Sequence, residues 1–160
     1  MVKSFIHTEG KGILFTGDSM LPTLKGGDRL KVVPVDPQKL TVGDIAVLHK
    51  DNIVCHRIVG RYKVKDRLFF LEKGDNRNKG FVKTVSAKEV MGRVIAVETE
   101  DGEVRDYRMI SNNIIKLRCR IFGIIYRFGK KIEKILFSNS PKGFKEKVAL
   151  TAAKALNYLI

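Results

Sequence analysis

The fold is decided by residues 44–62, which read DIAVLHKDNIVCHRIVGRY. Two β-rich runs, 44–49 and 53–62, flank Lys50-Asp51-Asn52, so this stretch predicts two strands joined by a turn. Similar short apolar runs cover residues 29–35, 67–72 and 90–99, and each is closed by Gly, Pro, Asp or Asn. Many short strands with such turns predict a mainly β, mostly antiparallel domain.

The charge is concentrated at the C-terminal end. The 160 residues include 31 Lys and Arg against 17 Asp and Glu, a net charge of +14. Residues 105–160 hold 13 basic and 3 acidic residues, a net of +10, whereas residues 1–104 carry only +4. Short apolar runs give way to helical spacing at the same place, so we expect a β domain over 1–104 and a basic helical tail over 105–160. The surplus indicates a phosphate-rich partner, either nucleic acid or an anionic membrane face.

The tail predicts two helices. Apolar residues recur at helical spacing from Ile110 to Ile135, and a second helix follows Ser140, its N-cap, and Pro141, its first helical residue. The first helix can lie on an anionic membrane through residues 110–137, or its apolar stripe can pack on the β domain or on the second helix. Both alternatives stay open. Its basic arc consists of Arg118, Arg120, Arg127, Lys130, Lys131 and Lys134.

Neither a membrane span nor a secretory signal is recognisable. No stretch reaches the ~20 apolar residues that a spanning helix needs, and residues 1–9, MVKSFIHTE, lack the apolar core of a signal peptide. We therefore expect a cytoplasmic protein, bound peripherally to the inner membrane face if the tail binds lipid. Cys55 and Cys119 cannot form a disulfide framework, and no metal-ligand spacing is present, so we expect no metal and no organic cofactor.

Three segments carry candidate chemistry, and each has a plainer explanation. Residues 17–22 place Ser19 on a glycine-led approach where backbone N–H groups can face an oxyanion, but the same residues are typical of a turn. Strand alternation puts His56 on a face with apolar neighbours, which suits a neutral base or a hydrogen-bonded core histidine. Residues 74–76 offer Asp75 to orient His56, or form a β-turn.

Taken together, the motifs resemble the signal peptidase I family over residues 12–97. The matching elements are Ser19-Met20-x-Pro22, Gly27-Asp28, His56-Arg57, Gly74-Asp75-Asn76 and Gly92-Arg93. The resemblance is to the branch with histidine in place of the usual bacterial lysine, and more distantly to LexA-like autoproteases. It implies a coiled antiparallel β-domain with Ser19 as nucleophile, His56 as general base and Asp75 as orienting acid.

The resemblance also bears on the residues around the serine. It implies that Gly17, Asp18, Met20 and Pro22 surround the oxyanion and the substrate. Many relatives have a hydroxyl two residues before the nucleophile, where this chain has Gly17, so the oxyanion would rely on backbone N–H groups, that of Ser19 first. The family's usual N-terminal membrane anchor is not recognisable here.

Two functions follow. The first is a serine endopeptidase with a Ser-His(-Asp) centre that cleaves a leader or signal-like segment of a peptide or protein at the cytoplasmic membrane face. The resemblance implies small residues just before the cut. The alternative is a catalytically inactive peptide-binding module, or a basic nucleic-acid-binding regulator of LexA-like fold. A regulator needs a helix-turn-helix, for which residues 1–16 are too short, and the tail has few aromatics placed for stacking, so we expect no nucleic-acid partner.

Overall fold

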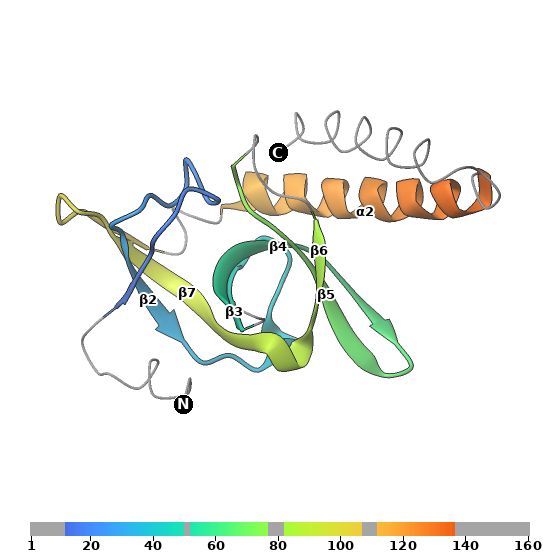
Figure 1. Cartoon of the computed structure of the whole chain (residues 1–160), viewed down its shortest axis with the longest axis horizontal. Helices are drawn as coiled ribbons and strands as arrows, with labels where there is room; N and C mark the ends of the chain where they lie inside the picture. Colours follow the sequence, from blue (N-terminus) through green and yellow to red (C-terminus); the bar gives the residue numbers. More distant parts are fainter. Residues whose placement is uncertain (1–11, 50–51, 77–81, 107–111, 137–160) are drawn as a thin grey trace.

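The computed structural model describes residues 12–49, 52–76, 82–106 and 112–136 (Figure 1). Within them the chain is mainly β: one antiparallel sheet of eight strands curls into a half-barrel, and a C-terminal helix lies along it. The strand order is β1-β2-β7-β3-β4-β5-β6, and β8 pairs with β7. The bounds are β1 Ile13–Leu14, β2 Arg29–Val33, β3 Ile45–His49, β4 Ile53–Val64, β5 Arg67–Lys73, β6 Lys83–Ser86, β7 Val90–Glu98, β8 Val104–Asp106 and α2 Asn113–Leu136, with 3-10 turns η2 Pro37–Lys39 and η3 Ala87–Glu89.

The five strands expected from the apolar runs are confirmed, with ends that differ by at most two residues. Three strands were not expected, namely β1, β6 and β8. They are two to four residues long, which is too short for alternation to be visible in the sequence. Of the expected turn at 50–52, residues 50 and 51 lie outside the described part. The boundary expected between residues 104 and 105 falls inside β8.

The central strand β3 is covered on both faces. It pairs with β4 on one side and β7 on the other, and residues 45–48 are fully buried. Val47 faces one apolar cluster, which contains Met20 and Leu24, while Leu48 faces a second cluster with Phe70. Burial on both sides holds β3 and its neighbour β4 in a fixed geometry, and β4 carries His56.

The helix α2 packs against β4 and β5. Cys119 and Phe122 bury themselves against Val59 and Leu71. A Cβ at Gly123 would clash with the carbonyl oxygen of Val59, so helix and strand approach closely at a glycine. The first expected helix is confirmed over 113–136, while residue 110 and the second expected helix lie outside the described residues. Among the described helices, none has the length and hydropathy to cross a membrane.

Candidate active site

Ser19 lies in a tight loop between β1 and β2. The ends of the loop are joined by two backbone hydrogen bonds, from Phe15 N to Asp28 O (2.8 Å) and from Gly27 N to Phe15 O (2.9 Å). Met20 and Leu24 are fully buried and anchor the loop in the core. Gly17 has φ +127°, a conformation that favours glycine, and it turns the chain just before Ser19. The expected turn therefore exists, and it presents the serine.

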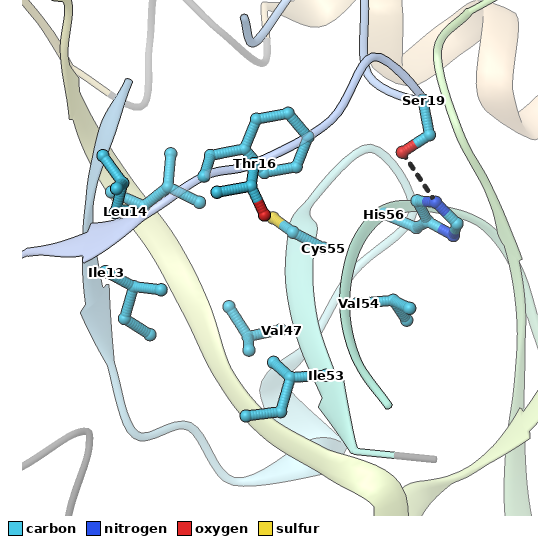
Figure 2. Close-up of a pocket in the computed structure, with 11 residues that line it drawn as sticks. Ile13, Leu14, Thr16, Ser19, Val47, Ile53, Val54, Cys55 and His56 are labelled. Atoms are coloured by element: carbon cyan, nitrogen blue, oxygen red, sulfur yellow. Dashed lines mark hydrogen bonds between the residues drawn. The ribbon is translucent and has the colours of Figure 1, made fainter. Parts of the chain in front are cut away.

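Ser19, His56 and Glu72 form a chain of hydrogen bonds. His56 Nε2 lies 3.1 Å from Ser19 Oγ, and His56 Nδ1 lies 2.6 Å from Glu72 Oε2. Figure 2 draws the first of these two contacts as a dashed line. The side chain of His56 is 18% exposed, whereas that of Glu72 is 1% exposed. A buried carboxylate that accepts a hydrogen bond from Nδ1–H keeps the ring proton on Nδ1. Nε2 is then the unprotonated nitrogen, which is the tautomer that a general base needs.

The β4–β5 register explains why Glu72 reaches His56. Ile58 on β4 is paired with Glu72 on β5. His56 lies two residues before Ile58 on the same strand face, so Glu72 is its diagonal neighbour. The sequence carries a signal for this contact, because Glu72 is in phase with Leu68 and Phe70 and is thus an acid on the core face of a strand.

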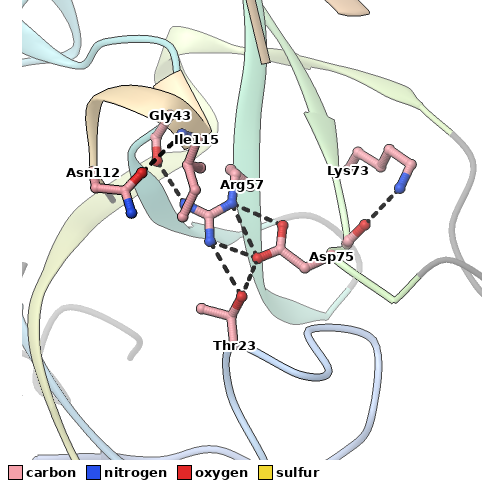
Figure 3. Close-up of polar contacts among 8 residues, drawn as sticks. Thr23, Gly43, Arg57, Lys73, Asp75, Asn112 and Ile115 are labelled. Carbon is pink, nitrogen blue, oxygen red and sulfur yellow. Dashed lines mark hydrogen bonds and ion pairs between the residues drawn. The ribbon is translucent and has the colours of Figure 1, made fainter. Parts of the chain in front are cut away.

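Asp75 occupies a different place from the one expected. Its carboxylate accepts hydrogen bonds from Arg57 Nε (2.8 Å to Oδ1) and from Thr23 Oγ1 (2.6 Å to Oδ2), as seen in Figure 3. Arg57 is 1% exposed and also donates to the carbonyl of Gly43 at 2.8 Å. The expectation that Asp75 orients His56 is thus corrected, because Glu72 lies at Nδ1 while Asp75 compensates a buried guanidinium and holds Thr23 of the serine loop.

The neighbours of Asp75 clamp the serine loop. Asn76 donates from its backbone N–H to the carbonyl of Ser19 and from its side chain to the carbonyl of Asp18, each at 2.9 Å. A Cβ at Gly74 would clash with the carbonyl oxygen of Ser19. The buried Lys73 in turn donates to the carbonyl of Gly74 at 3.0 Å. Residues 74–76 therefore fix the backbone of the nucleophile loop and do not contact the imidazole in any hydrogen bond that the described residues show.

A cavity of about 150 Å³, lined by polar groups as well as by aliphatic and aromatic side chains, opens beside Ser19 and His56. Strands β1 and β4 both line it, although β2, β7 and β3 lie between them in the sheet order, so the curl of the sheet brings them face to face (Figure 2). In the described residues, β5 pairs with β4 only from Arg57 onwards, so the part of β4 that lines the cavity, residues 53–56, is paired on the β3 side alone. The lining residues are Ile13, Leu14, Phe15, Thr16, Ser19, Leu30, Val47, Ile53, Val54, Cys55 and His56.

The four residues expected around the oxyanion and substrate shape the loop. None of Gly17, Asp18, Met20 and Pro22 lines the cavity. Met20 is a core residue, Asp18 binds Asn76 through its carbonyl oxygen, and the Leu21–Pro22 peptide is cis. Backbone N–H groups of the loop remain the available oxyanion donors at Ser19.

The cysteines are poor nucleophiles. Burial, followed by the nearby negative charge of Asp75, raises the pKa of Cys55 to about 12, and burial raises the pKa of Cys119 to about 11. Both thiols are therefore protonated at neutral pH, and the serine is the stronger candidate. Cys119, on the buried face of α2, packs against Val59 and Leu71. Within the described residues, no three His, Cys, Asp or Glu side chains are grouped so that they could hold a metal ion.

The structure brings residues 17–22, 55–59 and 74–76 together at the serine, the histidine and the loop clamp. No protein-family model, no curated protein and no solved structure matches the chain.

Proposed function

We propose that this protein is a serine endopeptidase with a Ser19–His56–Glu72 centre. The observation that carries the proposal is the hydrogen-bonded chain from Ser19 Oγ through His56 to the buried Glu72, at the rim of a cavity. A turn serine or a core histidine has no need of a third, buried acid on its far nitrogen. In this proposal Glu72, and not Asp75, is the acid that orients His56.

The chemistry follows from the three side chains. Ser19 Oγ attacks a peptide carbonyl while His56 Nε2 takes its proton, and Glu72 stays ionised and stabilises the imidazolium that forms. Loop N–H groups, that of Ser19 first, bind the oxyanion. His56 then passes the proton to the leaving amine, and water hydrolyses the acyl-enzyme by the reverse steps. The reaction needs no cofactor.

The substrate is an extended peptide segment. A peptide strand can add to the short edge strand β1 and pass between β1 and β4, with backbone hydrogen bonds giving affinity. The cavity beside Ser19 would take one side chain of small or aliphatic type, since its volume of about 150 Å³ holds a benzene-sized group and most of its lining residues are apolar. The family resemblance also implies small residues just before the cut. We propose that the substrate is a leader or signal-like segment of a peptide or protein, processed at the cytoplasmic membrane face.

The test is peptide cleavage read by mass spectrometry. The full chain is incubated with a mixture of synthetic peptides of randomised sequence, and new termini are identified. We expect cuts that follow a small or aliphatic residue, and none with Ser19→Ala or His56→Ala of unchanged circular dichroism. His49→Ala, at the exposed end of β3, is the matched control and should cleave like the natural chain.

Two results would contradict the proposal. Cleavage by folded Ser19→Ala would remove the serine from the mechanism. A natural chain that binds peptides yet cuts none would favour the inactive peptide-binding module instead.

A further inference from the structure

The helix α2 has two apolar faces, and within the part of the chain that the structure describes only one of them is packed. Residues 115, 119, 122 and 126 face the sheet and belong to one cluster with Val59 and Leu71. The opposite face carries six large apolar side chains that are 39% to 63% exposed. We name this the exposed stripe: Ile114, Leu117, Ile121, Ile124, Ile125 and Phe128.

The geometry of the exposed stripe is that of one continuous surface. At 3.6 residues per turn these six positions fall within about 100° of arc and span roughly 21 Å along the helix axis. A surface helix of a globular protein normally turns charged residues to this side. A contiguous apolar surface of this length on a water-facing helix indicates that something covers it.

The edges of the stripe are basic. Arg118 lies along one edge, and Arg120 and Lys131 lie along the other, by the same helical geometry. All three side chains are exposed. Residues 112–131 contain no aspartate or glutamate. The surface is thus an aliphatic strip between two rows of positive charge.

We propose that the exposed stripe binds an anionic lipid bilayer, with α2 lying in the plane of the interface. Charge complementarity selects this occupant. Residues 137–160 carry four lysines and one glutamate, and a second copy of the chain carries +14, so both would bring like charge against the basic edges. Anionic headgroups supply the opposite charge, and the acyl boundary takes the aliphatic side chains to a depth of about 5–10 Å.

The inference does not depend on the proposed peptidase activity, and its test has no catalytic readout. The full chain is sedimented with vesicles of phosphatidylcholine containing phosphatidylglycerol, and with phosphatidylcholine alone, at low and high salt. We expect binding to the anionic vesicles at low salt that falls at least tenfold at high salt or on neutral vesicles.

Two sets of variants locate the surface. Leu117→Ser/Ile121→Ser/Ile124→Ser should weaken binding by tenfold or more, and Arg118→Gln/Arg120→Gln/Lys131→Gln by about fivefold for each charge removed. The matched controls lie on exposed sheet positions: Val64→Ser/Val104→Ser for the apolar set and Lys31→Gln/Lys63→Gln/Arg67→Gln for the charges. Both controls should bind as the natural chain does, or more weakly by less than twofold.

Three outcomes would overturn the proposal. The first is no sedimentation with anionic vesicles at low salt, and the second is equal loss in the stripe variant and its control. The third concerns other occupants. If the Leu117→Ser/Ile121→Ser/Ile124→Ser variant lowers the urea midpoint as a core substitution would, the stripe is covered by residues 137–160. If the same variant converts a dimer to a monomer in sedimentation equilibrium, a second copy of the chain covers the stripe.

Discussion

At the scale of single residues, the proposed mechanism requires Glu72 to hold His56 in the tautomer that can act as a base. Glu72→Gln keeps the size of the side chain but lets an amide N–H face Nδ1, which favours the tautomer with its proton on Nε2. We expect kcat to fall by roughly 10²- to 10⁴-fold with little change in KM. Glu98→Gln, an exposed acid on β7, should leave kcat unchanged. The measurement is steady-state cleavage together with ¹⁵N chemical shifts of the His56 ring, which report the tautomer.

That prediction depends on a contact the sequence did not reveal. Ser19 and His56 could be predicted, because local features single each one out, a glycine-led turn and an apolar strand face. The third member depends on the pairing of β4 with β5, including a register shift between Ile58 and Gly60. A shift of this kind moves every later pair and cannot be read from a strand pattern, so the sequence alone favours the nearby Asp75 as the orienting acid.

Asp75 should contribute to the stability of the fold and not to the orientation of His56. Asp75→Asn removes the carboxylate that pairs with the buried Arg57, and breaking a buried ion pair on one side costs about 3–5 kcal/mol. We expect the free energy of unfolding in urea to drop by that order, while the His56 ring shifts stay as in the natural chain. Asp101→Asn, on an exposed turn, is the control. If Asp75→Asn left the stability unchanged but altered the tautomer of His56, Asp75 would be the residue that orients the imidazole.

The two buried thiols should resist alkylation. Because burial raises the pKa of Cys55 to about 12 and that of Cys119 to about 11, the thiolate fraction of Cys55 at pH 8 is only about one ten-thousandth. Iodoacetamide at pH 8 should leave the folded protein unmodified and fully active, whereas in guanidinium chloride both cysteines should react. Rapid labelling of the native protein with loss of activity would point to a thiol centre.

At the scale of elements, the clamp between the end of β5 and the serine loop should control the rate. A methyl group at Gly74 would meet the carbonyl oxygen of Ser19, so Gly74→Ala must push the loop away from His56. Misplacement of the nucleophile by about 1 Å can cost roughly 10²-fold in rate. Gly26→Ala, where a Cβ meets only ordinary contacts near Gly17, should stay active. Equal kcat/KM values for the two variants would show that the clamp is not needed.

The close approach of α2 to β4 gives a second prediction at this scale. Gly123→Ala places a methyl group against the carbonyl of Val59 and should lower the free energy of unfolding by about 1–3 kcal/mol. Gly129→Ala, on the same helix with open space around it, should raise it by up to about 1 kcal/mol through helix propensity alone. Urea unfolding of both variants measures the difference, and a stabilised Gly123→Ala would contradict the packing of α2 on the sheet.

Strands and helices could be predicted from the sequence where their apolar pattern extends over at least five residues. Five strands could be recognised because each has at least five residues between turn formers, whereas β1 exists only through its pairing with β2. The helix could be recognised from its spacing, but the spacing did not say which apolar residues face the sheet. The side facing Val59 is set by Gly123, Cys119 and Phe122, which permit close approach, and the longer run of Ile, Leu and Phe is left exposed.

At the scale of the whole molecule, the two proposals together predict that anionic membranes change what the protein cleaves best. A peptide found by the library screen is prepared in two forms, soluble and tethered to vesicles by an acyl chain. If α2 holds the protein on the same surface, enzyme and tethered substrate share a thin layer, and the effective concentration rises. We expect the tethered form to be cut at least tenfold faster on anionic vesicles than on neutral ones, and the soluble form at unchanged rate.

The stripe variant separates the two proposals in this experiment. Leu117→Ser/Ile121→Ser/Ile124→Ser changes only exposed residues of α2, so it should cut the soluble peptide like the natural chain and lose the gain on anionic vesicles. A variant that keeps the full gain would show that the peptide alone responds to lipid charge, which would refute the α2 surface and leave the serine centre intact. Loss of soluble cleavage in Ser19→Ala with vesicle binding retained would show the reverse independence, since the stripe and the serine belong to different elements of one sheet-and-helix body.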